Sequence, residues 1–116
     1  MINKFFLVGD IKRISISEGK SAGKQASAII LLQYGNPREE SGGAVEFVNA
    51  AMIRIPSYRF PALRDKLREG QKVVVEGHIQ GVFKKMLETG HFAVELVADR
   101  VTVESDGEAP ETVAAE

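Results

Sequence analysis

An aromatic residue beside two lysines is the first feature of the sequence that could do chemistry. Phe83, Lys84 and Lys85 end the segment EGQKVVVEGHIQGVFKK, residues 69–85, which begins as a valine-rich run. An aromatic ring can stack on a nucleic-acid base, and nearby ammonium groups can contact phosphates. Tyr34 has a comparable setting, because it precedes the polar segment GNPREESGG and is therefore expected to be exposed. The segment 69–85 is thus either a strand that only completes a sheet or one whose far end touches nucleic acid.

Catalytic chemistry finds little support in the sequence. The chain has no cysteine, which excludes disulfides, thiolate metal sites and cysteine nucleophiles. His78 and His91 lack the spacing of metal ligands, no nucleophile-elbow sequence occurs, and GKSAGK lacks the pattern of a phosphate-binding P-loop. We therefore expect a protein that is not an enzyme and needs no metal or cofactor.

Charge is distributed unevenly along the chain. The 116 residues include 15 Lys and Arg against 16 Asp and Glu, a net charge of −1. Residues 104–116, ESDGEAPETVAAE, hold five acids and no base, so residues 1–103 carry 15 bases against 11 acids. Phosphate binding depends on local cation density rather than on the sum, and a mildly basic body permits it.

The length allows one hydrophobic core, and we expect one folded domain over residues 1–104. Residues 105–116 are expected to form a short, acidic, disordered tail. No signal peptide and no apolar stretch of membrane-spanning length is visible, which favours a cytoplasmic protein.

Hydrophobic periodicity predicts five strands and one short helix. The strands are expected at residues 4–16, 25–34, 44–55, 71–82 and 91–103, with a polar loop at 35–43. Gly9 predicts a bulge or sharp bend in the first strand. Pro61, Leu63, Leu67 and Gly70 predict a helix of roughly two to three turns that ends at a glycine with positive φ. In the last strand one face is expected to hold Phe92, Val94, Leu96 and Ala98.

The resulting order, β-β-β-α-β-β, is that of an all-β OB-fold with one short helix, a five-stranded barrel whose curvature needs such glycine breaks. Another small all-β barrel or sandwich is the alternative. Phe5 and Phe6 are expected in core or subunit packing, Phe60 is expected to pack against the helix entry, and Tyr58 is undecided.

Four segments resemble, in order and spacing, the oligonucleotide-binding domain of bacterial single-stranded-DNA-binding proteins: INKFFLVGDI, FVNAAMIRI, LRDKLREGQKVVVEGHIQ and FAVELVADRVTV. The most specific piece is L-x-x-G-x-x-V-x-V-E-G from Leu67 to Gly77, and the second is I-N-K-x-x-L-V-G from Ile2 to Gly9. The resemblance covers roughly residues 1–104. It implies sequence-independent binding of single-stranded DNA in replication, recombination or repair, without catalysis, by a nucleoid-associated homotetramer or dimer.

The resemblance also implies a set of contact residues. Tyr34, Phe47 and Phe83, or Lys84 in place of Phe83, match the positions where that family stacks bases, although Phe47 is equally consistent with core packing. The cations expected to track phosphates lie on or beside strands that curve toward one groove: Lys4, Arg54, Lys72, Lys84 and Lys85.

The chain departs from the family at several of these positions. It has no tryptophan, Ile53 stands near a position where the family carries a stacking phenylalanine, and Gln80-Gly81-Val82 stands where the family places arginines. The tail closes in Ala-Ala-Glu without the aromatic tip through which the family recruits replication proteins. These departures indicate a divergent or accessory member. A primosomal accessory protein and an OB-fold protein-interaction module that has lost strong DNA binding remain alternatives.

Overall fold

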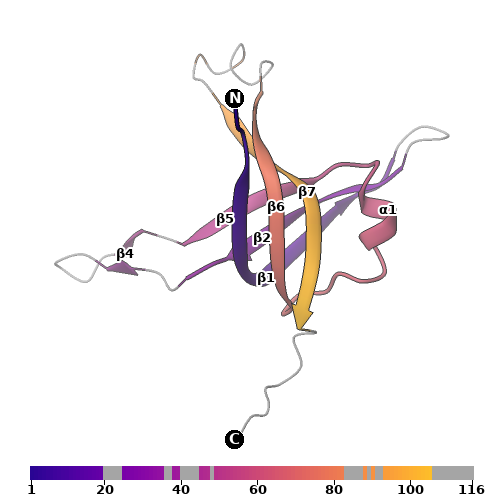
Figure 1. The fold of residues 1–116 in the computed structure, drawn as a ribbon, viewed down its shortest axis with the longest axis horizontal. Helices are drawn as coiled ribbons and strands as arrows, with labels where there is room; N and C mark the ends of the chain where they lie inside the picture. The colour runs from indigo at the N-terminus through magenta and orange to yellow at the C-terminus, as the bar shows by residue number, and fades with distance from the viewer. Residues whose placement is uncertain are drawn as a thin grey trace, which may run out of the picture.

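The computed structural model describes residues 1–19, 25–35, 38–39, 45–47, 49–82, 88, 90 and 93–105. Five strands close into a barrel in the order β1-β2-β5-β7-β6 (Figure 1). Their bounds are β1 Phe5–Ser17, β2 Ser27–Gln33, β5 Ala50–Ile55, β6 Lys72–Gly81 and β7 Val94–Ser105. Neighbouring strands are antiparallel except β5 and β7, which are parallel. This arrangement, with one short helix between β5 and β6, confirms the predicted five-stranded OB-fold.

The first strand is long because it serves two neighbours. Residues Phe5–Asp10 pair with β6, and residues Asp10–Ser17 pair with β2. At the crossing, a Cβ on Gly9 would lie 2.3 Å from the backbone oxygen of Gln33, so only glycine permits this approach without a backbone shift. The predicted bend is therefore present, and the accompanying bulge lies between Ile11 and Arg13 rather than at the glycine.

The barrel interior is filled by aliphatic side chains from every strand. Phe60 closes one end at 1% exposure, as its predicted packing role requires. Phe5 packs against the core from the side, but Phe6 points outward and is 61% exposed. Ile53 is fully buried. The other core residues with no exposure at all are Ile11, Ile30, Leu32, Ile55, Val73 and Val75.

The predicted helix is too long. Helix α1 covers only Phe60–Leu63, with proline in its first turn, and the amide of Arg64 donates to the Phe60 carbonyl at its end. The chain then turns, because the buried side chain of Gln71 accepts from the amide of Arg68 and donates to the carbonyl of Lys66, both at 2.7 Å. The Arg68 amide and the Lys66 carbonyl thus have hydrogen-bond partners although the helix does not continue.

The two ends of this helical region are tied to β1 and to Glu18, the residue that follows it. Gly70 has the predicted positive φ of 94°, but it belongs to the turn before β6, where its amide donates to the Ile11 carbonyl at 2.8 Å. Arg64 donates through both terminal nitrogens to the carboxylate of Glu18, and this hydrogen bonding lowers the pKa of Glu18. Leu67 lies after the end of α1 and is buried, and its amide donates to the Leu63 carbonyl at 3.1 Å.

The predicted third and fifth strands also differ from the observed ones. The third is split into β4 Val45–Phe47 and β5, and β4 pairs with β3 Arg38–Glu39, which lies in the expected loop. In β7 the register shifts so that Asp99 stands opposite no residue of β6, and this bulge breaks the expected alternation. Beyond the bulge the residues packed against the core are therefore Val101 and Val103, whereas Val94, at the start of β7, is 54% exposed. Phe92 lies outside the described residues.

Within the described residues, no helix is long and apolar enough to span a bilayer.

Candidate nucleic-acid interface

Two of the residues predicted to contact nucleic acid, Tyr34 and Lys72, line the same recess. It has a volume of about 230 Å³ and lies where β1 crosses from β6 to β2. Tyr34 follows the last residue of β2 and is 42% exposed, and Lys72 is the exposed first residue of β6. The other lining residues are Gly9, Asp10, Gln33 and Gly35. We call this site the Tyr34 recess.

The backbone around Tyr34 is held by hydrogen bonds. Its amide donates to the carbonyl of Asn49 at 2.8 Å, which joins the end of β2 to the residue before β5. The Gln33 side chain donates to the carbonyl of Gly35 at 3.0 Å. Together with the close approach of β1 at Gly9, these contacts place the tyrosine at the rim of the barrel.

The chemistry of the Tyr34 recess suits a nucleotide. A base can stack on the Tyr34 ring, which needs no particular sequence because every base has a π-face. The ammonium of Lys72 can meet a phosphate, while the Asp10 carboxylate, opposite Lys72 in the strand ladder, repels phosphate and can accept from a base amino group. The recess therefore has groups that can contact the base and the phosphate of a nucleotide.

Arg54 and Lys4 already have acidic partners. The Nε of Arg54 lies 2.7 Å from the carboxylate of Glu95, across the junction of β5 and β7. The Nζ of Lys4 lies 3.8 Å from Glu76 on β6, and Arg100 approaches the same carboxylate at 3.8 Å. Neither cation lines the Tyr34 recess. A phosphate would have to compete with a carboxylate at both positions.

The remaining predicted contact residues are only partly placed. Phe47 is the last residue of β4, where its backbone pairs with Arg38, and its side chain is outside the description. Phe83, Lys84 and Lys85 lie outside the described residues. The structure shows only that the strand before them ends at Gly81 and that the Val82 amide donates to the Ala93 carbonyl at 3.0 Å. Their roles remain predictions.

A surface that was not predicted lies beside the Tyr34 recess, on the outer face of β1, β2 and β5. Its shallow groove is lined by Arg13, Ser15, Ile29, Leu31 and Met52, and we call it the aliphatic groove. Met52 is 62% exposed and Ile29 is 39% exposed. The signal was present in the sequence, because Met52 alternates with the buried Ile53 and must point outward from β5. Aliphatic side chains can pack against bases but offer no π-face.

The histidine in the described part of the chain has a structural partner. The Nδ1 of His78 lies 3.1 Å from both carboxylate oxygens of Asp99, the bulged residue of β7. Among the described residues, no group of three or more His, Asp or Glu side chains could hold a metal ion. His91 lies outside the described residues.

No protein-family model matches the sequence, and no curated protein matches it significantly. Solved structures do match, among them single-stranded-DNA-binding proteins and the protein PriB. Rim1, the mitochondrial single-stranded-DNA-binding protein of S. cerevisiae, is 18% identical with a TM-score of 0.58, over 91% of this chain and 97% of that one.

Two further structures extend this likeness. PriB of Ralstonia solanacearum is 16% identical with a TM-score of 0.59, over 90% of this chain and 99% of that one. A Plasmodium falciparum SSB, solved in complex with single-stranded DNA, is 15% identical with a TM-score of 0.60, over 89% and 95%. At these identities the likeness establishes the fold, and the resemblance predicted from the sequence is confirmed at that level.

Proposed function

We propose that this protein binds single-stranded DNA without sequence preference and is not an enzyme. The observation that carries the proposal is the Tyr34 recess, where an exposed ring just after β2 and an exposed lysine at the start of β6 line one cavity. The fold supports it, because solved proteins with the same barrel are named for binding single-stranded DNA. Base stacking on Tyr34 and a phosphate contact from Lys72 form the binding mechanism.

A fluorescence-anisotropy titration with labelled oligo-dT, at several salt concentrations, tests the proposal. Tyr34→Ala should cost about 1–3 kcal/mol of binding free energy, while Tyr34→Phe should bind like the wild type because the ring remains. Lys72→Ala should lower the salt slope of log K by about 0.7. Lys66→Ala, which removes an exposed lysine that does not line the recess, is the matched control. Absence of binding at low salt would refute the proposal.

The proposed binding is weaker than that of a tryptophan-bearing relative. The chain has no tryptophan, and Arg54 and Lys4 are paired with Glu95 and Glu76. We therefore place the protein in an accessory role in DNA replication, recombination or repair, in the cytoplasm and at the nucleoid. A primosomal accessory role remains the alternative within this proposal, and the likeness to PriB supports the shared fold.

The proposal includes self-association. Phe6 and Val8 stand on the outer face of β1 and are 61% and 54% exposed, and Val8 is the cross-strand partner of Val74 on β6. A second copy placed over this face would remove the apolar surface from water and stabilise a dimer or tetramer.

A protein-interaction module is the second candidate, and the aliphatic groove favours it. Ile29, Leu31 and Met52 line this groove with apolar side chains, and none of its lining residues is aromatic. Met52→Glu distinguishes the two. It should abolish capture of a protein partner under the second candidate, and it should reduce oligonucleotide binding only modestly under the first.

A further inference from the structure

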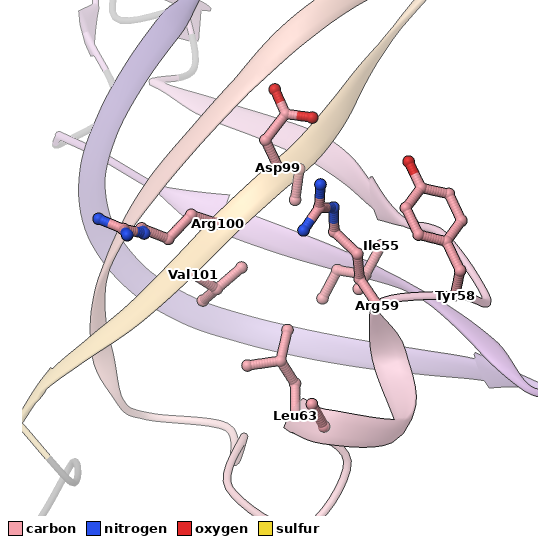
Figure 2. Close-up of a pocket in the computed structure, with 9 residues that line it drawn as sticks. Ile55, Tyr58, Arg59, Leu63, Asp99, Arg100 and Val101 are labelled. Carbon is pink, nitrogen blue, oxygen red and sulfur yellow. The ribbon is translucent and has the colours of Figure 1, made fainter.

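A second pairing of an aromatic ring with a cation, here an arginine, lies beyond the far end of β5, in the turn that leads to α1 (Figure 2). The Tyr58 side chain is 70% exposed, and the guanidinium carbon of Arg59 lies 5.3 Å from its ring centroid. Arg59 forms no salt bridge within the described part of the chain, unlike Arg54, Arg64 and Arg100. Its charge is therefore available to a ligand.

Tyr58 and Arg59 form the rim of a pocket of about 390 Å³ between α1 and β7, which we call the Tyr58 pocket. Its floor is apolar, made by Ile55, Leu63, Val101 and two alanines, Ala62 and Ala98. In Figure 2 the guanidinium of Arg59 lies between the Tyr58 ring and the Asp99 carboxylate, whereas the Arg100 side chain is directed to the other side of β7. Arg100 there approaches Glu76. Arg59 is thus the cation of this pocket.

We propose that the Tyr58 pocket receives one nucleotide of a bound single strand. The base would contact the Tyr58 ring and the apolar floor, and its phosphate would contact Arg59. The Asp99 carboxylate lies 3.1 Å from His78 and can accept from an N–H group of a base. The volume lies in the range of small-ligand sites, and the combination of ring, guanidinium and apolar floor matches the parts of a nucleotide.

The Tyr58 pocket and the Tyr34 recess lie near opposite ends of β5. The Tyr34 amide is hydrogen-bonded to the carbonyl of Asn49, the residue before β5. The Tyr58 pocket includes Ile55, the last residue of β5. The strand between them spans about 17 Å at the usual rise per residue. Met52 and Arg54 lie along its outer face. This inference rests on the proposed function. It implies that one single-stranded DNA molecule lies along β5 and reaches both sites.

Oligo-dT of two lengths, about 4 and about 16 nucleotides, tests the inference, because these are the limits of site size for one OB-fold. Tyr58→Ala should weaken binding of the long oligonucleotide about tenfold and leave binding of the short one unchanged. Arg59→Ala should lower the salt slope by about 0.7 for the long oligonucleotide only. Tyr58→Phe should restore wild-type binding, since the ring is retained.

Arg64→Ala is the matched control. It removes one guanidinium from the same helical region, but Glu18 holds that guanidinium away from the Tyr58 pocket. Binding like the wild type is expected, and a loss equal to that of Arg59→Ala would show a general charge effect and overturn the inference. Thermal melting of each variant confirms that it is folded.

The remaining outcomes separate the inference from the proposed function. If the wild type binds both oligonucleotides and the Tyr58 and Arg59 variants bind them equally well, the Tyr58 pocket is not a nucleotide site and only the inference fails. If the wild type binds neither, both fail. If a short peptide of Glu and Leu binds in an Arg59-dependent way while oligonucleotide binding does not depend on Arg59, the pocket takes acidic peptides and the inference is wrong.

Discussion

Replacing Glu95 by glutamine should strengthen binding of single-stranded DNA. Its carboxylate lies 2.7 Å from Arg54, and the two side chains are 29% and 35% exposed. Exposed ion pairs of this kind contribute about 0.2–1 kcal/mol, because water and salt screen them. A phosphate that binds Arg54 must first displace Glu95. Removing the carboxylate therefore raises the affinity by about 1.5- to 5-fold if Arg54 contacts phosphate.

The salt dependence gives a sharper measurement than the affinity alone. One additional phosphate contact should steepen the slope of log K against log salt by about 0.7 for a single strand. Anisotropy titrations of Glu95→Gln and wild type at four or more salt concentrations, with the same oligo-dT, measure both quantities.

Glu104→Gln is the control for a general change of charge. Glu104 is an exposed residue near the end of β7, about 30 Å along the strand from Glu95 at the usual rise per residue. It should alter the slope little. If Glu95→Gln and Glu104→Gln change the affinity equally, or if Glu95→Gln leaves the slope unchanged, Arg54 does not contact phosphate and the reasoning is refuted.

Three further substitutions test the fold and the assembly. Gly9→Ala places a Cβ 2.3 Å from the Gln33 oxygen and should lower the free energy of unfolding by about 1–3 kcal/mol and weaken DNA binding; unchanged urea melting would contradict this. Gln71→Leu leaves the Arg68 amide and Lys66 carbonyl without their partner and should cost about 1–3 kcal/mol in the same assay, whereas an unaltered midpoint would show that water replaces it. Phe6→Glu should give a smaller species in sedimentation velocity, and an unchanged distribution would exclude the outer face of β1 as the interface.

The barrel could be predicted because the features that specify it are visible in short stretches of sequence. Alternating side chains mark the strands, and Gly9 marks the point where the first strand bends toward a second neighbour. The length of the helix was not predictable, because Leu63 and Leu67 are spaced alike in a helix and in the observed turn. What decides between the two is the buried side chain of Gln71, whose bonds are visible only in three dimensions.

The sequence allowed us to predict which side chains would be exposed at the candidate site. It did not allow us to predict the ion pairs that those side chains form. Tyr34 could be recognised from the loop that follows it, and Lys72 from its place at the start of a strand. The neutralisation of Arg54 could not, since Glu95 lies 41 residues away in the sequence. The extra residue at Asp99 likewise leaves no local trace, although it changes which side chains of β7 face the core.

The contact between Arg54 and Glu95 has a mechanical consequence for the barrel. It lies across the parallel junction of β5 and β7, where only two residue pairs are in register, Ile53 with Leu96 and Arg54 with Val97. The other barrel junctions have six or more such pairs. This junction is therefore the shortest strand pairing in the barrel, and the Arg54–Glu95 ion pair bridges it. If Arg54 leaves Glu95 to bind a phosphate, it no longer bridges this junction, so DNA binding and opening of the barrel would be linked through one side chain.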